Sequence, residues 1–386
     1  MSMNLRPHQQ IGLDALAKYN KGQVIVPTGG GKTLIAIKDA MRRFESDFKT
    51  IVVVAPRILL AQQLSSEFLE LIDNVKVMHV HSGETHHYSS TNSHEIRVWN
   101  NNTIGYRMIF TTYHSLHKVM EADINIDTIY FDEAHNAIQK NFIEAVEYFS
   151  MYADRAYFFT ATPKHSLTPM KIGMNDVDIF GQVICNVPAP KLVKEGYILP
   201  PKMIVKTIDV REEQVNESEH IVDTIDDISV KKVLICARST KQIIKLIDQT
   251  NFTQELESRD YSCMYITAKT GAYIDGKKVN RDIFFDTLNT WCKDPDKRFV
   301  VLHHSILSEG INVKGLEAAL FLRNMDVIGL SQTIGRVIRT GDNSKKYGLI
   351  VVPTWDKVGI STSKRLSGVV DTVFNKGEAA ISKVRK

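Results

Sequence analysis

The stretch 26–33, VPTGGGKT, places three glycines directly before a lysine and a threonine. Such glycines free the backbone to wrap a phosphate with its N–H groups, the lysine adds a positive charge, and the threonine hydroxyl can ligate Mg²⁺. Val26 stands where the usual pattern begins with glycine, so a flexible strand-to-helix turn is the alternative. The residues expected at a phosphate are Thr28, Gly29, Gly30, Gly31, Lys32 and Thr33.

Two adjacent carboxylates follow an apolar run in TIYFDEAH, 128–135. Carboxylates at the end of a buried strand cost free energy unless they share a cation or take part in a reaction. In a nucleotide site, Asp132 would hold Mg²⁺ and Glu133 would orient and deprotonate the attacking water. A solvated turn at the strand end is the alternative, and the glycine-rich stretch weakens it.

The stretch 332–339, QTIGRVIR, places polar and cationic side chains at helical spacing. On a helix, Gln332, Arg336 and Arg339 fall at i, i+4 and i+7 and point the same way. Arginines supplied across a cleft neutralise the charge that develops during phosphoryl transfer. The alternative is an ordinary cationic helix face. An arginine from a second domain would make hydrolysis depend on closure of the cleft.

The elements that must position these residues follow a regular pattern. Short apolar runs alternate mostly with segments of helical period, and one such segment, 32–44, follows the glycines directly. Continuous apolar runs suit strands that are buried on both faces, which is typical of a parallel α/β sheet. The predicted strands of this half are 23–28, 50–56, 75–82, 107–113, 128–134 and 156–162.

A second α/β series follows the proline pair 200–201 and a polar, acidic segment, 209–227. We therefore predict two α/β domains, 1–200 and 201–386, joined by a proline-containing linker. A cleft between two such domains is the expected active site. The predicted strands of the second series are 232–238, 261–267, 298–305, 318–324 and 347–353.

The composition of the 386-residue chain is that of a soluble globular protein, with 43% hydrophobic and 24% charged residues. The formal net charge of +4 creates no strong global field, so nucleic acid would bind only at a local surface. Four scattered cysteines argue against a zinc ribbon or a disulfide scaffold. Without a recognisable signal peptide or bilayer-spanning run, we expect a cytoplasmic protein with no membrane partner.

One polar segment, 82–107, departs from the alternation. A metal site is one interpretation of its histidines. We favour a solvated loop, because no carboxylate or cysteine stands at ligand spacing. The histidines in or beside the segment are His79, His81, His86, His87 and His94.

The order of the motifs resembles that of superfamily 2 helicases of the DEAH-box type over most of the chain. Among these motifs, DEAH and the Q-x-x-G-R-x-x-R of 332–339 are the specific ones. In this superfamily the first position of motif I is often not glycine. The corresponding stretches are LRPHQ (5–9) for adenine recognition, 26–33 for motif I, APRILLAQQ (55–63) for Ia, TTYHSL (111–116) for Ib, DEAH for II, TAT (160–162) for III, VLICAR (233–238) for IV, SEGINV (308–313) for V and 332–339 for VI.

The resemblance implies two RecA-like α/β domains with parallel sheets and an ATP and Mg²⁺ site in the cleft between them. It implies catalytic roles for Lys32, Glu133, Arg336 and Arg339, Mg²⁺ ligation by Thr33 and Asp132, and ATP contacts from Arg6, Gln9, Gly310 and Asn312 besides the phosphate loop. It implies coupling of hydrolysis to movement by His135, Thr160, Thr162 and Gln332, and contact with a nucleic-acid backbone by Arg57, Thr111 and Thr112.

The implied function is that of an ATP-dependent helicase or translocase that works as a monomer. It is expected to act on DNA in preference to RNA, in bacterial or phage-infected cytosol. The pattern is closest to compact recombination and repair helicases, including phage ones, and to restriction-enzyme motor subunits. Asn312 stands where motif V usually has aspartate, so that nucleotide contact is expected to be either weaker or purely by hydrogen bond. An ATP-gated clamp or an RNA helicase without strong unwinding is the alternative, whereas a single-domain kinase would need neither the second α/β series nor motif VI.

The basic tail, 361–386, is either a nucleic-acid grip or a solvated helix.

Overall fold

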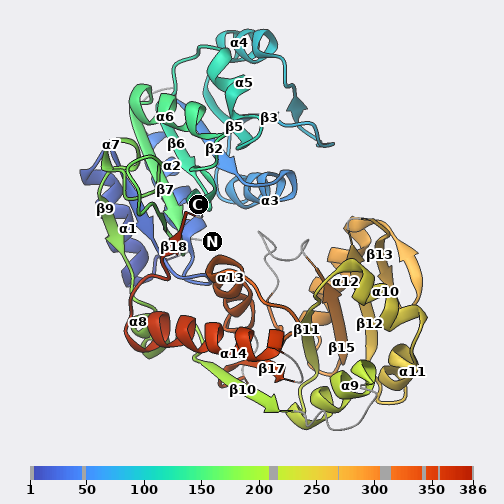
Figure 1. Cartoon of the computed structure of the whole chain (residues 1–386). Helices are drawn as coiled ribbons and strands as arrows, with labels where there is room; N and C mark the ends of the chain where they lie inside the picture. Colours follow the sequence, from blue (N-terminus) through green and yellow to red (C-terminus); the bar gives the residue numbers. More distant parts are fainter. Residues whose placement is uncertain are drawn as a thin grey trace. The chain divides into compact units, whose positions relative to one another are not determined.

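The computed structural model contains two compact units, each drawn in Figure 1 with its own sheet and helices. Unit 1 comprises Met1–Pro188 and Ala379–Lys386, and unit 2 comprises Ala189–Glu378. Within the described residues, every helix is too short or too polar to traverse a bilayer. The structure describes residues 4–45, 49–207, 216–267, 269–304, 314–340, 345–354 and 357–384.

The described part of unit 1 contains an eight-stranded sheet in the order β4-β3-β5-β2-β6-β7-β1-β9, with all neighbours parallel. All six runs predicted in this half are strands, which confirms the parallel α/β sheet. The edge strand β4 is exposed and only two residues long, and the edge strand β9 is partly exposed with a short apolar run of three residues. The strands are β1 (Lys21–Ile25), β2 (Thr50–Ala55), β3 (Val75–Val80), β4 (Tyr88–Ser89), β5 (Tyr106–Thr112), β6 (Thr128–Phe131), β7 (Arg155–Thr160) and β9 (Val183–Asn186).

Helices cover both faces of this sheet. All six residues of β2 are buried, and successive side chains of a strand point to opposite faces. Val52 and Val54 pack in one apolar cluster with Val119 of α5 and Val146 of α6. Burial on both faces is why the run is continuously apolar rather than alternating. The helices are α1 (Pro7–Lys18), α2 (Lys32–Arg43), α3 (Ile58–Leu69), α4 (Ser93–Asn102), α5 (Leu116–Glu121), η1 (Ala134–Asn136), α6 (Ile143–Tyr152) and α7 (Val177–Phe180).

The described part of unit 2 contains a second eight-stranded sheet, in the order β10-β17-β16-β11-β15-β12-β13-β14. The five predicted runs are strands of its parallel part. The strands are β10 (Pro201–Thr207), β11 (Lys232–Cys236), β12 (Ser262–Thr267), β13 (Gly271–Ile274), β14 (Lys277–Val279), β15 (Phe299–His303), β16 (Ala318–Phe321) and β17 (Gly348–Thr354). The helices are α8 (Ala189–Lys194), α9 (Glu217–Ile228), α10 (Thr240–Asp248), α11 (Phe252–Glu257), α12 (Arg281–Lys293), α13 (Val327–Val337), α14 (Lys357–Val370) and η3 (Asp371–Asn375).

One edge of the second sheet is antiparallel, which the sequence analysis did not predict. β12 pairs with β13, and β13 pairs with β14 through a turn at Asp275 and Gly276. Both turn residues have positive φ, 44° and 75°, as a two-residue hairpin turn with Asp-Gly requires. The hairpin was missed because β14 is mostly exposed and lacks the apolar run of a buried strand.

Contacts place the boundary between the units at Pro188 rather than at residue 200. The Leu199 N–H donates to the Ile338 carbonyl (2.7 Å), and Ile198 pairs with Arg339. These bonds hold the residues after α8 within unit 2. The proline pair therefore interrupts regular structure inside unit 2, where β10 begins, and does not separate the units.

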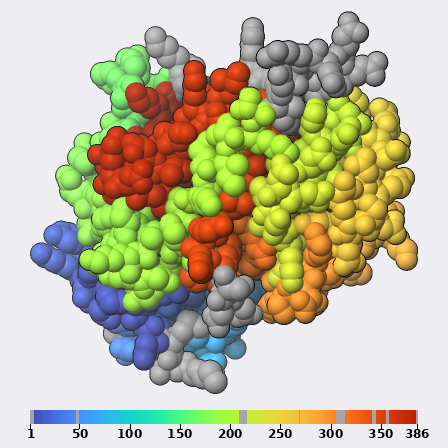
Figure 2. Space-filling model, turned by 90° about the horizontal axis from the view of Figure 1, so that it is seen from below, coloured from blue at the N-terminus to red at the C-terminus, as the bar shows by residue number. Residues whose placement is uncertain are grey.

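The C-terminal stretch contains a helix and then a strand. α14 packs on β17 and lies at the surface, coloured red in Figure 2. β18 (Ser382–Lys383) then pairs in parallel with β8 (Lys164–His165) of unit 1. The sequence analysis offered two alternatives for this tail, a nucleic-acid grip or a solvated helix. Neither alternative included the strand β18.

The solvated loop expected over 82–107 is only partly present, because 93–102 form α4 with the Asn92 side chain as its N-cap. His79 and His81 are buried outside the loop, with their Nδ1 and Nε2 atoms 3.0 Å apart. Burial lowers the pKa of His79 to about 3, so this imidazole is a neutral core group. In the described part of the chain, no cluster of three or more His, Cys, Asp or Glu side chains is arranged to hold a metal ion.

The added strand β18 can be tested by removing its backbone donors. The N–H groups of Ser382 and Val384 donate to the Pro163 and His165 carbonyls, at 2.9 and 3.0 Å. Proline at both positions removes both donors, so we expect the C-terminal stretch to be released and trypsin to cleave it several times faster. Lys383→Pro is the matched control, because alternate residues of a strand donate to the same neighbour. Equally fast cleavage of the control would contradict the pairing.

Candidate functional site

The loop after β1 shows why Val26 can replace the glycine of the usual pattern. Val26 is fully buried and its N–H donates to the Thr160 carbonyl (3.1 Å), so it continues β1 beside β7. Positive φ occurs instead at Gly29 (87°) and Gly31 (83°), where glycine carries no steric cost. Valine at position 26 is therefore compatible with a phosphate loop.

The same loop leads into the N-terminus of α2, which favours an anion. α2 begins at Lys32, with Gly31 as its N-cap, so the first N–H groups of a 12-residue helix lie at the loop. The Thr28 hydroxyl is buried and has no hydrogen-bond partner among the described residues. A phosphate would accept hydrogen bonds from these N–H groups and from this hydroxyl. The loop therefore fits the phosphates of a nucleotide.

Lys32 and Glu133 come together at the carboxyl edge of the sheet. The Lys32 Nζ lies 3.7 Å from the Glu133 Oε1, and the two side chains are only 11% and 12% exposed. Glu133 has φ 45° and ψ 53°, a left-handed conformation that costs a non-glycine residue free energy. Strain of this kind is concentrated at functional sites. The lysine and the carboxylate are thus held close despite the strain.

Asp132 is the second carboxylate of this edge. Burial and the neighbouring Glu133 raise its pKa to about 7, while Lys32 opposes the rise. Its backbone is fixed on both sides, because its N–H donates to the Val54 carbonyl (2.8 Å) and its carbonyl accepts from the buried Tyr113 hydroxyl (2.9 Å). Its carboxylate is therefore presented at a defined place beside the phosphate loop.

The donor set at this edge suits Mg²⁺. Thr33 lies in the first turn of α2 and Asp132 follows β6, and hydroxyl and carboxylate oxygens are hard ligands. Mg²⁺ in nucleotide sites takes one or two protein ligands and completes its shell with water and phosphate oxygens. A site with only two protein oxygens thus fits this ion.

His135 links the carboxylate pair to the end of β7. The Asn136 amide donates to the Glu133 carbonyl (3.0 Å), which identifies its nitrogen, and the same nitrogen lies 3.2 Å from the His135 Nε2. Nε2 is therefore an acceptor and Nδ1 carries the proton. Nδ1 lies 3.1 Å from the Thr160 Oγ1 and 3.4 Å from the Thr162 Oγ1. The structure thus joins His135, Thr160 and Thr162 in one buried network.

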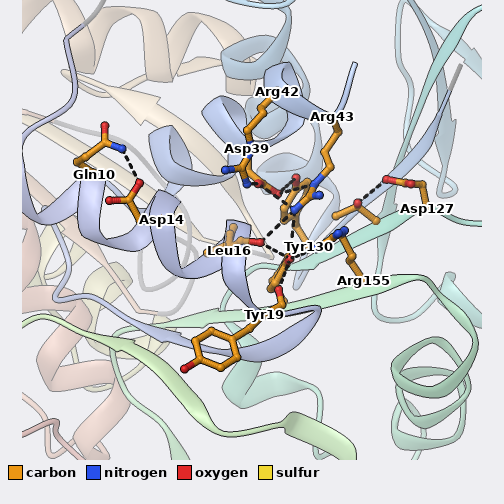
Figure 3. A network of polar contacts seen from close by, with 12 residues as sticks. Gln10, Asp14, Leu16, Tyr19, Asp39, Arg42, Arg43, Asp127, Tyr130 and Arg155 are labelled. Atoms are coloured by element: carbon orange, nitrogen blue, oxygen red, sulfur yellow. Dashed lines mark hydrogen bonds and ion pairs between the residues drawn. The ribbon is translucent and has the colours of Figure 1, made fainter. Parts of the chain in front are cut away.

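A buried polar network fixes the elements behind the loop (Figure 3). The Asp39 carboxylate of α2 accepts from the Tyr130 hydroxyl of β6 (2.7 Å) and from Arg43 (3.2 Å). Arg43 also donates to the Leu16 carbonyl of α1 (3.1 Å), and the Tyr157 hydroxyl of β7 lies 2.7 Å from the same carbonyl. One network thus connects α1 and β7 with α2, which begins at the loop, and with β6, which leads to the carboxylates.

Unit 2 places the motif VI residues differently from the sequence expectation. Gln332 and Arg336 lie on α13, which ends at Val337, so Arg339 is not on the helix. The backbone turns away there because the residues after the helix pair with 198–199. The three side chains therefore do not form one helical face. Gly310 and Asn312 of motif V lie outside the described residues.

The three predicted nucleic-acid contacts differ in exposure. Arg57 is exposed and stands at the N-cap of α3. Thr111 is fully buried, and its hydroxyl donates to the Val80 carbonyl (2.9 Å); Thr112 is 3% exposed. Both threonines belong to the central strand β5. Arg57 is therefore the exposed member of the predicted set, and all three contacts stay predictions.

Three residues at the site were not singled out from the sequence. Tyr113 and Asn136 hold the backbone and the histidine of motif II, as described above. His8 of α1 contacts the Gly30 carbonyl of the phosphate loop at 2.7 Å. His8 stands next to Gln9, which donates to the Gly31 carbonyl (3.2 Å), and its position between Arg6 and Gln9 was the available signal.

These features define a phosphate-loop α/β protein with an Asp-Glu pair beside the loop. Residues 2–165 match the protein family described as "Type III restriction enzyme, res subunit", which is less than half of the chain. No curated protein matches the sequence. The match covers the phosphate loop, the carboxylate pair and Thr160–Thr162 together.

Solved structures share the fold over nearly the whole chain. The Type ISP restriction-modification enzyme LlaBIII bound to DNA is 18% identical, with a TM-score of 0.76 over 100% of this chain and 31% of its own. LlaGI in complex with a DNA substrate mimic is 18% identical, with a TM-score of 0.70 over 98% and 30%. Mycobacterium smegmatis Lhr, bound to ssDNA and AMP-PNP, is 16% identical, with a TM-score of 0.62 over 95% and 48%.

The fold is therefore one of two α/β units with largely parallel sheets, as the sequence predicts, and it is similar to that of these restriction-enzyme and helicase structures. The chain spans about a third of the two restriction enzymes and about half of the helicase.

Replacing Tyr130 with phenylalanine tests the network behind the loop. The hydroxyl donates to a buried carboxylate, so its loss should lower the free energy of unfolding by about 1.5–3 kcal/mol. Chemical denaturation measures this change. Tyr148→Phe is the matched control, because the Tyr148 hydroxyl has no hydrogen bond within the described residues, and it should change stability by less than about 0.5 kcal/mol. Equal effects of the two variants would contradict the role of the network.

Replacing Asp132 with asparagine tests its raised pKa. The folded-state pKa of about 7 lies above the ordinary value of about 3.9, so the folded state binds more protons between these values and ionisation of Asp132 costs stability as pH rises. The Tm of Asp132→Asn minus that of the wild type should therefore increase from about pH 4 to about pH 7 and then level off. Thermal unfolding in EDTA measures the difference. A difference independent of pH would contradict the assignment.

Proposed function

We propose that this chain is an ATP-driven motor core that translocates along DNA or remodels it. The observation that carries the proposal is the close approach of Lys32 to Glu133 beside the phosphate loop, with Asp132 adjacent. A cation, a base and a metal-binding carboxylate at one helix N-terminus are the groups that hydrolysis of a phosphoanhydride uses. The likeness in fold to nucleic-acid motors supports the coupling of this hydrolysis to movement.

In this mechanism the phosphate loop binds the triphosphate, and Lys32 neutralises charge on its outer phosphates. Bound Mg²⁺, held by Asp132 and Thr33, would supply further charge neutralisation to the phosphates. Glu133 orients water and takes its proton. Arg6 and Gln9 of the α1 region contact the base. We assign the remaining charge stabilisation to Arg336 and Arg339 of unit 2.

Coupling follows from the buried network at the ends of β6 and β7. His135 touches the side chains of both Thr160 and Thr162. Because the His135 Nδ1 also lies 3.5 Å from the Glu133 Oε2, a change at Glu133 during hydrolysis reaches the segment that leads to β8 through direct contacts. Gln332 belongs to the same proposed coupling set in unit 2. The DEAH-box subtype is our assignment for this arrangement.

DNA is the proposed substrate, because the two restriction enzymes with this fold were solved with DNA or a DNA mimic and the helicase with ssDNA. Arg57 is the expected backbone contact on unit 1, and such contacts grip phosphates without reading sequence. A role in repair, recombination, replication or restriction, as a monomer in the cytoplasm, fits this activity. An ATP-gated clamp would use the same residues, and strand displacement distinguishes it from a helicase.

Two substitutions test the chemistry. Lys32→Ala removes the phosphate-binding charge, and Glu133→Gln removes the base while keeping its shape, so each should lower ATP turnover by about 100-fold or more. Glu133→Gln should still bind ATP, whereas Lys32→Ala should bind it weakly. A coupled ATPase assay and fluorescent-nucleotide titration measure the two effects. Lys76→Ala, at an exposed lysine far along the sheet, is the control and should leave both unchanged.

The coupling to nucleic acid is tested with the wild-type protein. ATP turnover should rise severalfold when single-stranded, duplex or forked DNA is added, and RNA should stimulate it less. If no nucleic acid changes the rate of ATP turnover, the motor function is contradicted. The assignment of the nucleotide site would not be affected by that result.

A further inference from the structure

Two consecutive residues of α1 reach two consecutive carbonyls of the phosphate loop. The His8 Nε2 lies 2.7 Å from the Gly30 carbonyl, and the Gln9 Nε2 donates to the Gly31 carbonyl at 3.2 Å. His8 is 1% exposed. Because a carbonyl only accepts, the His8 Nε2 must carry a hydrogen. The loop is thus held from behind by two side-chain donors of one helix.

This anchoring determines where the N–H groups of the loop point. In a trans peptide the C=O and the N–H point in opposite directions. Holding the Gly30 carbonyl toward α1 therefore turns the Gly31 N–H away from α1, and holding the Gly31 carbonyl does the same for the Lys32 N–H. The Gly30 N–H is already used, because it donates to the Pro27 carbonyl at 2.9 Å. The next two N–H groups are thus free to converge on an anion, as in other backbone anion sites.

α1 is a firm support for these contacts. Gly12 packs so closely on α2 that a Cβ atom there would lie 2.9 Å from the Ile35 Cδ1. Farther along, the Leu16 carbonyl accepts from Arg43 of α2 at 3.1 Å. The helix that carries His8 is therefore fixed to the helix that begins at the loop, and a shift of one requires a shift of the other.

The two donors differ in what else they do. Gln9 is assigned to the base of ATP in the proposed function, and its Oε1 also accepts from the Arg6 N–H at 2.9 Å. A glutamine that turns toward a base weakens its bond to Gly31. His8 is buried next to Gln9, and its contact with the loop described above is the one with the Gly30 carbonyl.

We propose that His8 is the positioning residue of the phosphate loop: its bond to the Gly30 carbonyl keeps the Gly31 N–H directed at the phosphates whatever base is bound. This inference rests on the proposed nucleotide-binding function. It separates the two neighbours by role, because His8 sets affinity for the phosphates and Gln9 sets preference for the base.

The test is a matched pair, His8→Gln and His8→Met. Both side chains are unbranched and of similar length, but only glutamine places a donor where the His8 Nε2 stands. His8→Met should raise the KM for ATP and for GTP by the same factor, about 10-fold, and His8→Gln should restore both to within about 3-fold of the wild type. Gln9→Ala should instead change the ratio of the two KM values. Pyrophosphate, used as a competitor without a base, should inhibit His8→Met about 10-fold less strongly than His8→Gln.

The results for the His8 variants test the role of His8, and the activity of the wild-type protein tests the proposed function. Equal KM values and equal pyrophosphate inhibition for the methionine and glutamine variants would overturn the role of His8, as would a changed ATP-to-GTP ratio in His8→Met. Tm values measured for both variants show whether packing differs, and a lower Tm with unchanged KM in His8→Met would also overturn it. A wild-type protein that neither binds nor hydrolyses ATP would contradict the proposed function itself.

Discussion

The parallel pairing of β6, β7 and β1 is the constraint on which the site depends. These strands are neighbours in the sheet, with Phe131 opposite Phe158 and Ile25 opposite Thr160. Because all three run in the same direction, the residues that follow them meet at one edge. That edge brings together the phosphate loop, the carboxylate pair and the threonines after β7. The local sequence of any one of these segments does not determine that the three lie together.

Placing charges at such an edge has an energetic cost, and the surroundings offset it. Burial raises the pKa of Asp132, and the approach of Lys32 opposes this rise. The backbone of Asp132 donates to the Val54 carbonyl and accepts from the Tyr113 hydroxyl, so the carboxylate is oriented before any ligand arrives. Glu133 accepts a left-handed backbone for the same reason. Prearranged polar groups of this kind are what catalysis of phosphoryl transfer requires.

Much of the fold could be read from apolar runs, because parallel strands covered on both faces are apolar at every position. The expectation missed β4, β9, β10, β13 and β14, because these strands at or beside the sheet edges are short or only partly buried and lack a long apolar run. It also treated 82–107 as a loop, although Asn92 caps a helix there. The sequence analysis placed the domain boundary at the proline pair 200–201, where regular structure is interrupted. The contacts place the boundary between the units twelve residues earlier, at residue 188 rather than 200.

At the site, the sequence by itself determined which groups are available: a glycine loop followed by a lysine, two adjacent carboxylates, and arginines in the second half. It determined this because the residue types and their spacing are chemical facts of the chain. The tertiary structure decided which of them act together. In the tertiary structure Thr111 is buried in a central strand, Arg339 lies beyond the end of α13, and His8 contacts the Gly30 carbonyl. Burial and partnership depend on segments far apart in the chain, and only the packed sheet and its helices bring those segments into contact.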